Sequence, residues 1–438
     1  MNKIDIKDLS KYYGKEVTIQ GFVDNVRDMQ YVQFIILRDG TGKTQITIEK
    51  SVETNQAMME LVSKLTLEST LKVTAMVMEN PKVKLNGMEL IPSAILVTSI
   101  SLPELPIDIK DRDKTLRETR LDWRFLDLRR EDNNLFFKCQ TLIEHAMREY
   151  WIKNDFMEIH SPKISGASAE SGSETFKLDY FGTPAVLSQS PQFYKQMALS
   201  AGFDKVFEIG PAFRAENSHT SYHATEINMV DVEISWIDSV SDVMDHEEAL
   251  LKNVFTTLKA KYELDIKKTF NLELPLFEEA FPKITFYEAK QIIKDKFNYV
   301  AANTLDFERK EEELIWQYVR EKYHSDFVFI TKYPYEARPF YHMLDNDGLT
   351  NSYDLIFKGI EITTGAQREH HPDVLIKQIA GKGIDPKTLE FYTNFFKYGC
   401  PPHGGFAIGV ARLMMQIFEI DNIREATFIY RGPTRLNP

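Results

Sequence analysis

Two segments of the chain combine arginine, glutamate, histidine and glycine at spacings that suit a nucleotide. The first is FRAENSHTSYH, residues 213–223, and the second is GGFAIGVAR, residues 404–412. The apolar run before Arg214 predicts a strand that ends near this residue, with Glu216 two positions further on and on the same face. Arg214 offers a planar, permanently charged fork for phosphate oxygens, whereas Glu216 and His223 can bond to an adenine or ribose edge. The pattern therefore indicates a nucleoside triphosphate site.

The second segment adds backbone and stacking features. Gly404, Gly405 and Gly409 allow close approach of the backbone to a ligand. Arg412, expected early in a helix, can stack its guanidinium on a nucleobase. Either segment taken alone is also explained by a glycine-rich turn and surface arginines. Together the two segments predict ATP-dependent amino-acid activation on an antiparallel sheet.

In this order, the two segments resemble motifs 2 and 3 of the class II aminoacyl-tRNA synthetases. Residues 136–164 resemble motif 1, because apolar residues recur there at helical spacing before the strand-like FMEIHSP. The resemblance implies a catalytic domain built on an antiparallel sheet flanked by helices, with Arg214 and Arg412 as catalytic residues and a homodimer as the assembly. Over its whole length the chain is similar to the compact archaeal-type aspartyl-tRNA synthetases.

Composition agrees with a soluble protein of two or three domains. The chain has 438 residues, of which 43% are hydrophobic and 27% are charged. No apolar run approaches the ~20 residues that span a bilayer, and the N-terminus has no apolar signal-peptide centre, so we expect a cytoplasmic protein without membrane association. Two cysteines exclude a disulfide framework and a four-cysteine zinc site. A net charge of −12 constrains solubility more than it constrains a local nucleic-acid patch.

The N-terminal region reads as five short strands broken by turn signals, which predicts an oligonucleotide-binding (OB) barrel over residues 1–102. In such barrels exposed aromatic residues stack on unpaired bases. The resemblance implies that this is the anticodon-binding domain for tRNA(Asp), with Phe34 as the stacking residue and Arg27 and Gln45 as base contacts. Without the resemblance, the alternative is that Phe34 is a core residue of its strand.

The overall fold is therefore expected to be multi-domain α+β. Residues 103–133 contain prolines and dense alternating charge, which favours a hinge segment before a catalytic domain at 134–438. The hinge arginines either contact the tRNA or form solvated salt bridges, and the sequence leaves both open.

A loop and a short polar cluster are candidates for binding the amino acid. Residues 165–176 are rich in glycine and serine, as in a lid or in a mobile linker. The resemblance implies a flipping loop whose Glu170 faces the substrate ammonium group. Gln192 and Lys195, near the start of a predicted helix, suit a small zwitterion with an extra carboxylate.

Two positions select aspartate over asparagine in this family. Lys195 matches the lysine that pairs with the aspartate side chain, where asparaginyl enzymes have an apolar residue. Asp231 matches an aspartate where asparaginyl enzymes have glutamate. Arg368 is implied to bind the aspartate side chain together with Lys195. A buried ammonium without a counter-charge is costly, so an amide substrate is disfavoured.

The resemblance also supplies a magnesium site. Asp354 and Glu361 are the implied ligands, assisted by Thr364, and Glu361 also belongs to the ATP site together with Glu216, His223 and Gly409. Hard oxygen ligands suit magnesium bound to substrate phosphates. His370 and His371 do not predict a zinc site, because adjacent residues on a strand point to opposite faces.

The implied activity is ligation of L-aspartate to tRNA(Asp), through an aspartyl adenylate made from ATP with Mg²⁺. The sequence departs from the family pattern at Tyr222, where an arginine is expected, and at Ile227, where many relatives have an aromatic residue. Charging of tRNA(Asn) as well stays open. The alternatives are an asparaginyl-tRNA synthetase and a synthetase paralogue repurposed for amide-forming biosynthesis without tRNA charging.

Overall fold

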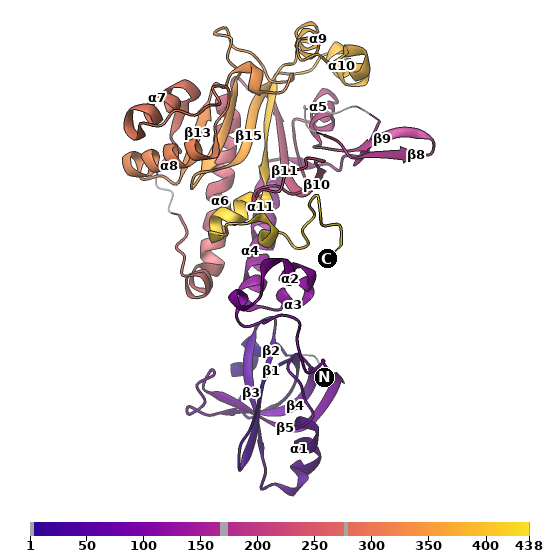
Figure 1. Ribbon diagram of the computed structural model, residues 1–438, viewed down its shortest axis with the longest axis vertical. Coiled ribbons are helices and arrows are strands. Elements are labelled where there is room, and N and C mark those ends of the chain that lie inside the picture. The colour runs from indigo at the N-terminus through magenta and orange to yellow at the C-terminus, as the bar shows by residue number, and fades with distance from the viewer. Residues whose placement is uncertain (1–3, 167–173, 276–278, 438) are drawn as a thin grey trace. The chain divides into compact units, whose positions relative to one another are not determined.

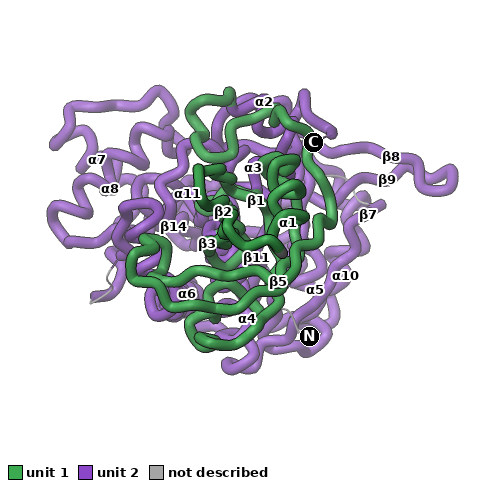
Figure 2. The backbone as a smooth tube through the Cα atoms, turned by 90° about the horizontal axis from the view of Figure 1, so that it is seen from below, with its two compact units in different colours: residues 1–116, 129–134 green, residues 117–128, 135–438 purple. Residues whose placement is uncertain are grey.

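The computed structural model describes residues 4–166, 174–275 and 279–437. The contacts divide the chain into two compact units, coloured separately in Figure 2. Unit 1 comprises residues 1–116 and 129–134, and unit 2 comprises residues 117–128 and 135–438. The segment 103–133 therefore contributes to both units.

Unit 1 is a closed five-stranded barrel in the order β1-β2-β3-β5-β4. Its strands are β1 (Glu16–Asp28), β2 (Val32–Asp39), β3 (Gly42–Glu49), β4 (Thr70–Glu79) and β5 (Met88–Ser99), with helix α1 (Gln56–Val62) between β3 and β4. Alternate residues of β4 are buried, as expected when one face of each strand fills the barrel. The predicted OB fold is confirmed, and all five expected strands are present.

The centre of unit 2 is an eight-stranded sheet in the order β12-β13-β14-β15-β16-β11-β10-β6. Neighbouring strands from β13 to β10 are antiparallel, whereas β6 and β12 join the two edges in parallel. The expected antiparallel sheet is thereby confirmed. The strand bounds are β6 (Met157–Glu158), β10 (Lys205–Phe213), β11 (Glu226–Ser235), β12 (Lys283–Thr285), β13 (Phe327–Thr331), β14 (Ser352–Phe357), β15 (Ile360–Arg368) and β16 (His403–Gly409).

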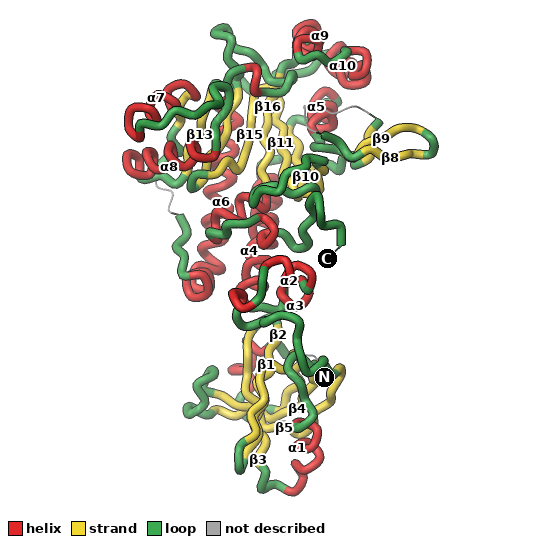
Figure 3. The backbone as a smooth tube through the Cα atoms, in the orientation of Figure 1, coloured by secondary structure: helices red, strands yellow, loops and turns green. Residues whose placement is uncertain are grey.

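Helices flank this sheet, and Figures 1 and 3 show α7 and α8 beside β13, near the β12 edge of the sheet. The long helix α6 is buried against β15 and β16, and a Ser239/Asp242 capping box starts it. A separate three-stranded sheet contains β7 (Ile164–Ser165), β9 (Thr183–Leu187) and β8 (Lys177–Tyr180). The helices are α2 (Arg117–Asp122), α3 (Arg124–Asp127), α4 (Glu131–Lys153), α5 (Gln192–Ser200), α6 (Val240–Phe270), α7 (Phe286–Phe297), α8 (Arg309–Tyr323), α9 (Pro372–Gly381), α10 (Glu390–Lys397), α11 (Val410–Phe418) and α12 (Ile423–Ala426).

Two arginines of the expected hinge are buried inside unit 2. Arg124 is 2% exposed and bonds to Asp127, and Arg120 bonds to Asp127 and Glu425. Neither arginine is therefore a solvated salt-bridge partner or free to contact RNA. Their role is structural, because removal of one partner would leave a buried charge uncompensated. Among the described residues, no helix is long and apolar enough to span a membrane.

Candidate active site and nucleic-acid interface

A pocket of about 130 Å³ in unit 2 brings together the residues expected to bind ATP. The turn between β10 and β11 supplies one wall, β15 supplies a second, and the junction of β16 with α11 supplies a third. Arg214 lies one residue beyond the end of β10, and Arg412 is the third residue of α11, as the sequence predicted. Residues from both motif segments line the pocket: Arg214, Glu216, His223, Gly409 and Arg412, together with Glu361 and Thr364 of β15.

The charges in this pocket are arranged around Glu361. The Arg412 Nη1 donates to the Glu361 carbonyl oxygen at 3.3 Å and lies 3.7 Å from its carboxylate. Burial, with a further contribution from the Asp354 carboxylate, raises the pKa of Glu361. Burial and the nearby Arg412 lower the pKa of His223. His223 is therefore neutral near pH 7 and can accept or donate a hydrogen bond.

The expected magnesium ligands occupy neighbouring strands but differ in their present partners. Thr364 pairs with Asp354 across β14 and β15, and its Oγ1 donates to Glu361 Oε1 at 3.0 Å. Asp354 is held by both Nη atoms of Arg338, at 3.0 and 2.5 Å. Glu361 and Thr364 offer the hard oxygen ligands that magnesium prefers, and a bound cation would offset the burial and the Asp354 charge that raise the pKa of Glu361. Both carboxylate oxygens of Asp354 accept hydrogen bonds from Arg338 in this structure, so Asp354 would have to leave Arg338 to bind magnesium.

A buried cluster of charges lies further along the same strands, where the amino acid is expected. Lys195 of α5 is 0% exposed, with its Nζ 2.9 Å from Asp231 Oδ1 and 3.3 Å from Glu233 Oε2. The Arg368 Nε donates to Glu233 Oε1 at 2.9 Å. Asp231 pairs with Ala407, two residues from the Met229 and Gly409 pair that lines the ATP pocket. The structure therefore places Lys195, Asp231 and Arg368 together, beside that pocket.

Glu233 contacts both Lys195 and Arg368, and the sequence patterns did not single it out as a site residue. It is fully buried, and although burial acts to raise its pKa, Arg368 and Lys195 outweigh burial and hold the pKa below its usual value. The available signal was its position two residues after Asp231, which puts both carboxylates on one face of β11. A Cβ at Gly405 would lie only 2.3 Å from the Glu233 carboxylate, so β16 needs glycine here.

His342 was also missed, and no sequence pattern pointed to it. The Arg368 Nη1 lies 3.0 Å from His342 Nε2, and the His342 side chain is 1% exposed. Burial, aided by the charge of Arg368, holds the pKa of His342 well below its usual value. The neutral ring can then accept a hydrogen bond from the Arg368 guanidinium through Nε2. Arg368 is thus held by Glu233 and by His342.

Gln192 and Glu170 are the two other residues that were expected to contact the amino acid. Gln192 is buried, and its Nε2 has no hydrogen-bond partner among the described residues, which leaves a donor for a ligand. Glu170 lies outside the described residues.

Two sequence interpretations are wrong in detail. Gly404 and Gly405 do not open space for a ligand, because Cβ atoms there would meet the Ala366 carbonyl and the Glu233 carboxylate. Nor do His370 and His371 point to opposite faces. Strand β15 ends before them, their rings are 4.1 Å apart, and with Glu369 they form a group whose ligand atoms lie within 4.8 Å. The Glu369 carboxylate instead accepts the backbone N–H of His371 at 2.8 Å.

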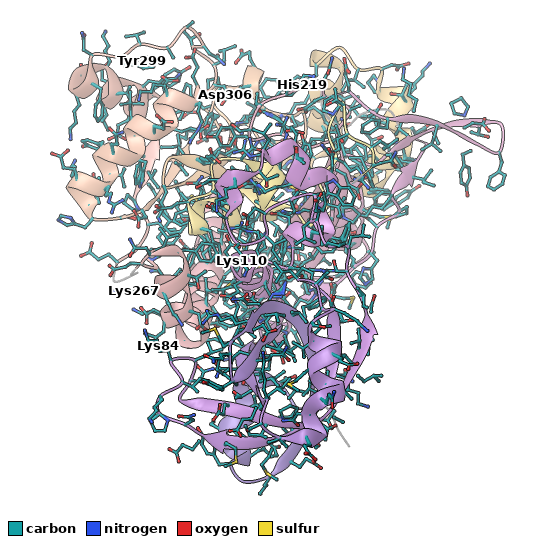
Figure 4. All side chains as sticks on the ribbon, turned by 60° about the horizontal axis from the view of Figure 1, so that its bottom comes forward. Lys84, Lys110, His219, Lys267, Tyr299 and Asp306 are labelled. Atoms are coloured by element: carbon teal, nitrogen blue, oxygen red, sulfur yellow. The ribbon has the colours of Figure 1, made fainter. Side chains whose placement is uncertain are left out.

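Unit 1 has an open pocket of about 880 Å³ on the faces of β1, β2 and β3. Arg27, Phe34 and Gln45 line it, together with Tyr31 and the β4–β5 turn that carries Lys84, labelled in Figure 4. Arg27 pairs directly with Phe34 across β1 and β2. Phe34 is half-buried and is not among the buried residues of the barrel core, so the core alternative loses support. The surface combines basic and aromatic side chains, as single-stranded nucleic acid requires.

Comparison with known proteins agrees with both units. The family model of class II tRNA synthetases (D, K and N) matches residues 116–430, and the OB-fold nucleic acid binding domain matches residues 17–97. The chain belongs to the class II tRNA synthetases. It is 40% identical to an aspartate–tRNA(Asp) ligase of Pyrococcus abyssi, with 97% of each chain covered. It is also 40% identical to an aspartate–tRNA(Asp/Asn) ligase of Methanopyrus kandleri, with 97% of this chain and 96% of that protein covered.

A solved asparaginyl-tRNA synthetase of Pyrococcus horikoshii, in complex with asparaginyl-adenylate, has a similar fold. The TM-score is 0.92 at 29% identity, and the whole of both chains is covered. In the present chain, Tyr222 and Ile227 are the two departures from the family pattern. Both residues line the pocket in which ATP is expected. Half-buried tyrosine and isoleucine side chains replace charge and ring area at the place where ATP is expected.

Proposed function

We propose that the protein is an aspartate–tRNA ligase. The observation that carries the proposal is the buried cluster of Lys195, Arg368, Asp231 and Glu233 beside the nucleotide pocket. Two cations held inside the protein suit the side-chain carboxylate of L-aspartate, and Asp231 suits its ammonium group. The similarity to aspartate–tRNA ligases over nearly the full length supports the same substrate.

In the proposed reaction, the α-carboxylate of aspartate attacks the α-phosphorus of ATP and releases pyrophosphate. The terminal ribose hydroxyl of the tRNA then takes the acyl group from the adenylate and releases AMP. No side-chain nucleophile is required. Arg214 and Arg412 act by binding the phosphates and by stabilising negative charge that develops on them.

Glu361 and Thr364 would hold magnesium, and Asp354 would join them if Arg338 released it. Bound magnesium would neutralise charge on the ATP phosphate oxygens. Glu216, His223 and Gly409 are proposed to bind the nucleoside, because they line the same pocket. Gln192 is proposed to bind aspartate through its unpaired amide. Glu170 is proposed to contact the ammonium group of the substrate aspartate.

The tRNA is proposed to bind unit 1 through its anticodon, with Phe34 as the stacking residue and Arg27 and Gln45 as base contacts. One of the two relatives above is named an aspartate–tRNA(Asp) ligase, and the other an aspartate–tRNA(Asp/Asn) ligase. We propose tRNA(Asp) as the substrate, with tRNA(Asn) as the second substrate to be tested.

A cytoplasmic homodimer is part of the proposal. β6 forms one edge of the large sheet, and Met157 in it is 50% exposed. Ile152, near the end of α4, is 65% exposed. Apolar side chains at a sheet edge suit contact with a second copy. Light scattering after size-exclusion chromatography measures the assembly directly.

The test is aminoacylation with radiolabelled aspartate, using transcripts of tRNA(Asp) and tRNA(Asn) separately. Charging of tRNA(Asp) is the expected result, and charging of both identifies a non-discriminating enzyme. Charging with asparagine in place of aspartate, or no charging at all, contradicts the proposal.

The variant Arg214→Ala tests the activation step. It should lower aspartate-dependent pyrophosphate exchange by about 100- to 1000-fold, the loss typical of removing one transition-state donor. Arg320→Ala, on the exposed face of α8, is the matched control and should exchange at the normal rate. Normal exchange by Arg214→Ala would rule out its assigned role.

A further inference from the structure

Arg309, the first residue of α8, lies against a wall of the ATP pocket. Its guanidinium carbon is 5.1 Å from the centroid of the Tyr222 ring, and Tyr222 lines the pocket. The helix pair α7 and α8 lies beside β13 in Figure 1, and α8 also contacts β15. The segment that leads from α7 into α8 carries Asp306, labelled in Figure 4. An element outside the three motif segments thus reaches the nucleotide site.

The charged residues of the pocket lining balance one another. Arg214 and Arg412 are matched by Glu216 and Glu361, and His223 is neutral because burial lowers its pKa. The lining therefore adds no net positive charge for a triphosphate. A further cation close to the wall would stabilise the bound polyanion, because the interaction is strengthened in a partly desolvated site.

Two carboxylates of the same helix are the present partners of Arg309, and its Nε has no hydrogen-bond partner among the described residues. Its Nη1 lies 3.3 Å from Glu312 and its Nη2 lies 3.7 Å from Glu313. Glu313 is partly exposed, where ion pairs contribute little.

Arg309 lies on the side of the pocket where the ATP phosphates are expected. Glu312, in the same turn of α8, accepts the backbone N–H of Glu361 at 3.0 Å. Glu361 is also a proposed magnesium ligand, and magnesium in such sites is bound by the phosphates of the substrate. Arg309 is therefore next to the side of the pocket where the metal is proposed to bind.

We propose that Arg309 is a further ATP-binding residue, whose guanidinium contacts the β- and γ-phosphates while its side chain rests on the Tyr222 ring. The inference rests on the proposed assignment of this pocket to ATP. It gives α8 a direct part in nucleotide binding, at the position where Tyr222 departs from the family pattern.

The test is titration calorimetry of the full-length protein with Mg-ATP and, separately, with AMP. Arg309→Gln should weaken ATP binding at least about tenfold, the effect of losing one charge-assisted hydrogen bond. AMP lacks the β- and γ-phosphates, so its affinity should change less than about twofold on that scale. Arg309→Lys should be intermediate. Arg320→Gln, in the last turn of the same helix, is the matched control and should bind both ligands normally.

An unchanged ATP affinity in Arg309→Gln overturns the inference, and so does an equal loss for ATP and AMP, which would show a structural role. Adding Tyr222→Arg to Arg309→Gln should restore ATP binding, because it returns a guanidinium to the same wall. ATP binding needs no amino acid. A protein that fails to charge tRNA with aspartate but shows the ATP-specific loss would refute the proposed function and keep the role of Arg309.

Discussion

Replacement of Lys195 by methionine tests the amino-acid site most directly. Methionine keeps the approximate length of the side chain and removes its charge. The Lys195 ammonium is fully buried, 2.9 Å from Asp231 and 3.3 Å from Glu233. Without it, Arg368 alone opposes two carboxylates, and the carboxylate of an incoming aspartate meets net negative charge. We expect Lys195→Met to disfavour aspartate far more than asparagine.

The magnitude follows from the burial of the cluster. Removing one partner of a buried charge pair costs about 2 to 5 kcal/mol, part of which comes from the charges left unpaired. At about 1.36 kcal/mol per factor of ten, kcat/KM for aspartate should fall by about 30- to 5000-fold. The assay is pyrophosphate exchange with aspartate and with asparagine as separate substrates. The ratio of their kcat/KM values should shift toward asparagine.

Two controls separate specificity from loss of structure. Lys252→Met removes a lysine that bonds to Glu248 at 2.7 Å on a partly exposed face of α6, and should leave the exchange rate unchanged. Lys195→Met combined with Asp231→Asn balances the buried charge and should recover thermal stability without recovering aspartate preference. A fall of less than about threefold for aspartate, or an equal fall for both amino acids, would refute the reasoning.

Two further predictions concern the barrel and a buried carboxyl group. Phe34→Ala should raise KM for tRNA by about 5- to 150-fold, which corresponds to the roughly 1 to 3 kcal/mol of one base stack, and should leave pyrophosphate exchange intact. Tyr13→Ala, on the same unit, is the control, and equal effects of the two variants would exclude stacking at Phe34. Glu247 accepts a hydrogen bond from the Tyr353 hydroxyl. Burial raises the pKa of the Glu247 carboxyl group to about 7. The folded protein therefore holds a proton on Glu247 that the unfolded chain releases. The free energy of unfolding should fall by on the order of 3 kcal/mol as pH rises from about 4.5 to about 7. Glu247→Gln should flatten this part of the profile of urea unfolding against pH, and an unchanged slope would contradict the pKa shift.

Much of the fold could be predicted because local patterns encode it. Alternation of apolar residues and turn signals placed all five barrel strands, and the run before Arg214 placed the end of β10 within one residue. The contacts of Arg120 and Arg124 could not be predicted. Their charges look solvated in the sequence, and only the contacts of α2 and α3 with α12 show that they are buried.

The candidate site also has residues that local sequence predicted and residues whose arrangement it did not predict. Arg214, Glu216 and His223 belong to one continuous segment, so their side chains must converge wherever the turn folds. His370 and His371 show the limit of this reasoning. Their arrangement depended on where β15 ends, and the strand stops at Arg368, before either histidine.

The sequence by itself determined which residue types could bind ATP and aspartate. Arginines, carboxylates and glycines at fixed spacing within one short segment can be recognised without knowledge of the fold. Tertiary structure decided which of them meet. The register of β11 against β16 puts Glu233 over Gly405 and between Lys195 and Arg368, and the packing of α8 on the sheet brings Arg309 to Tyr222. Contacts between distant segments depend on strand register and helix packing, and no local pattern specifies either.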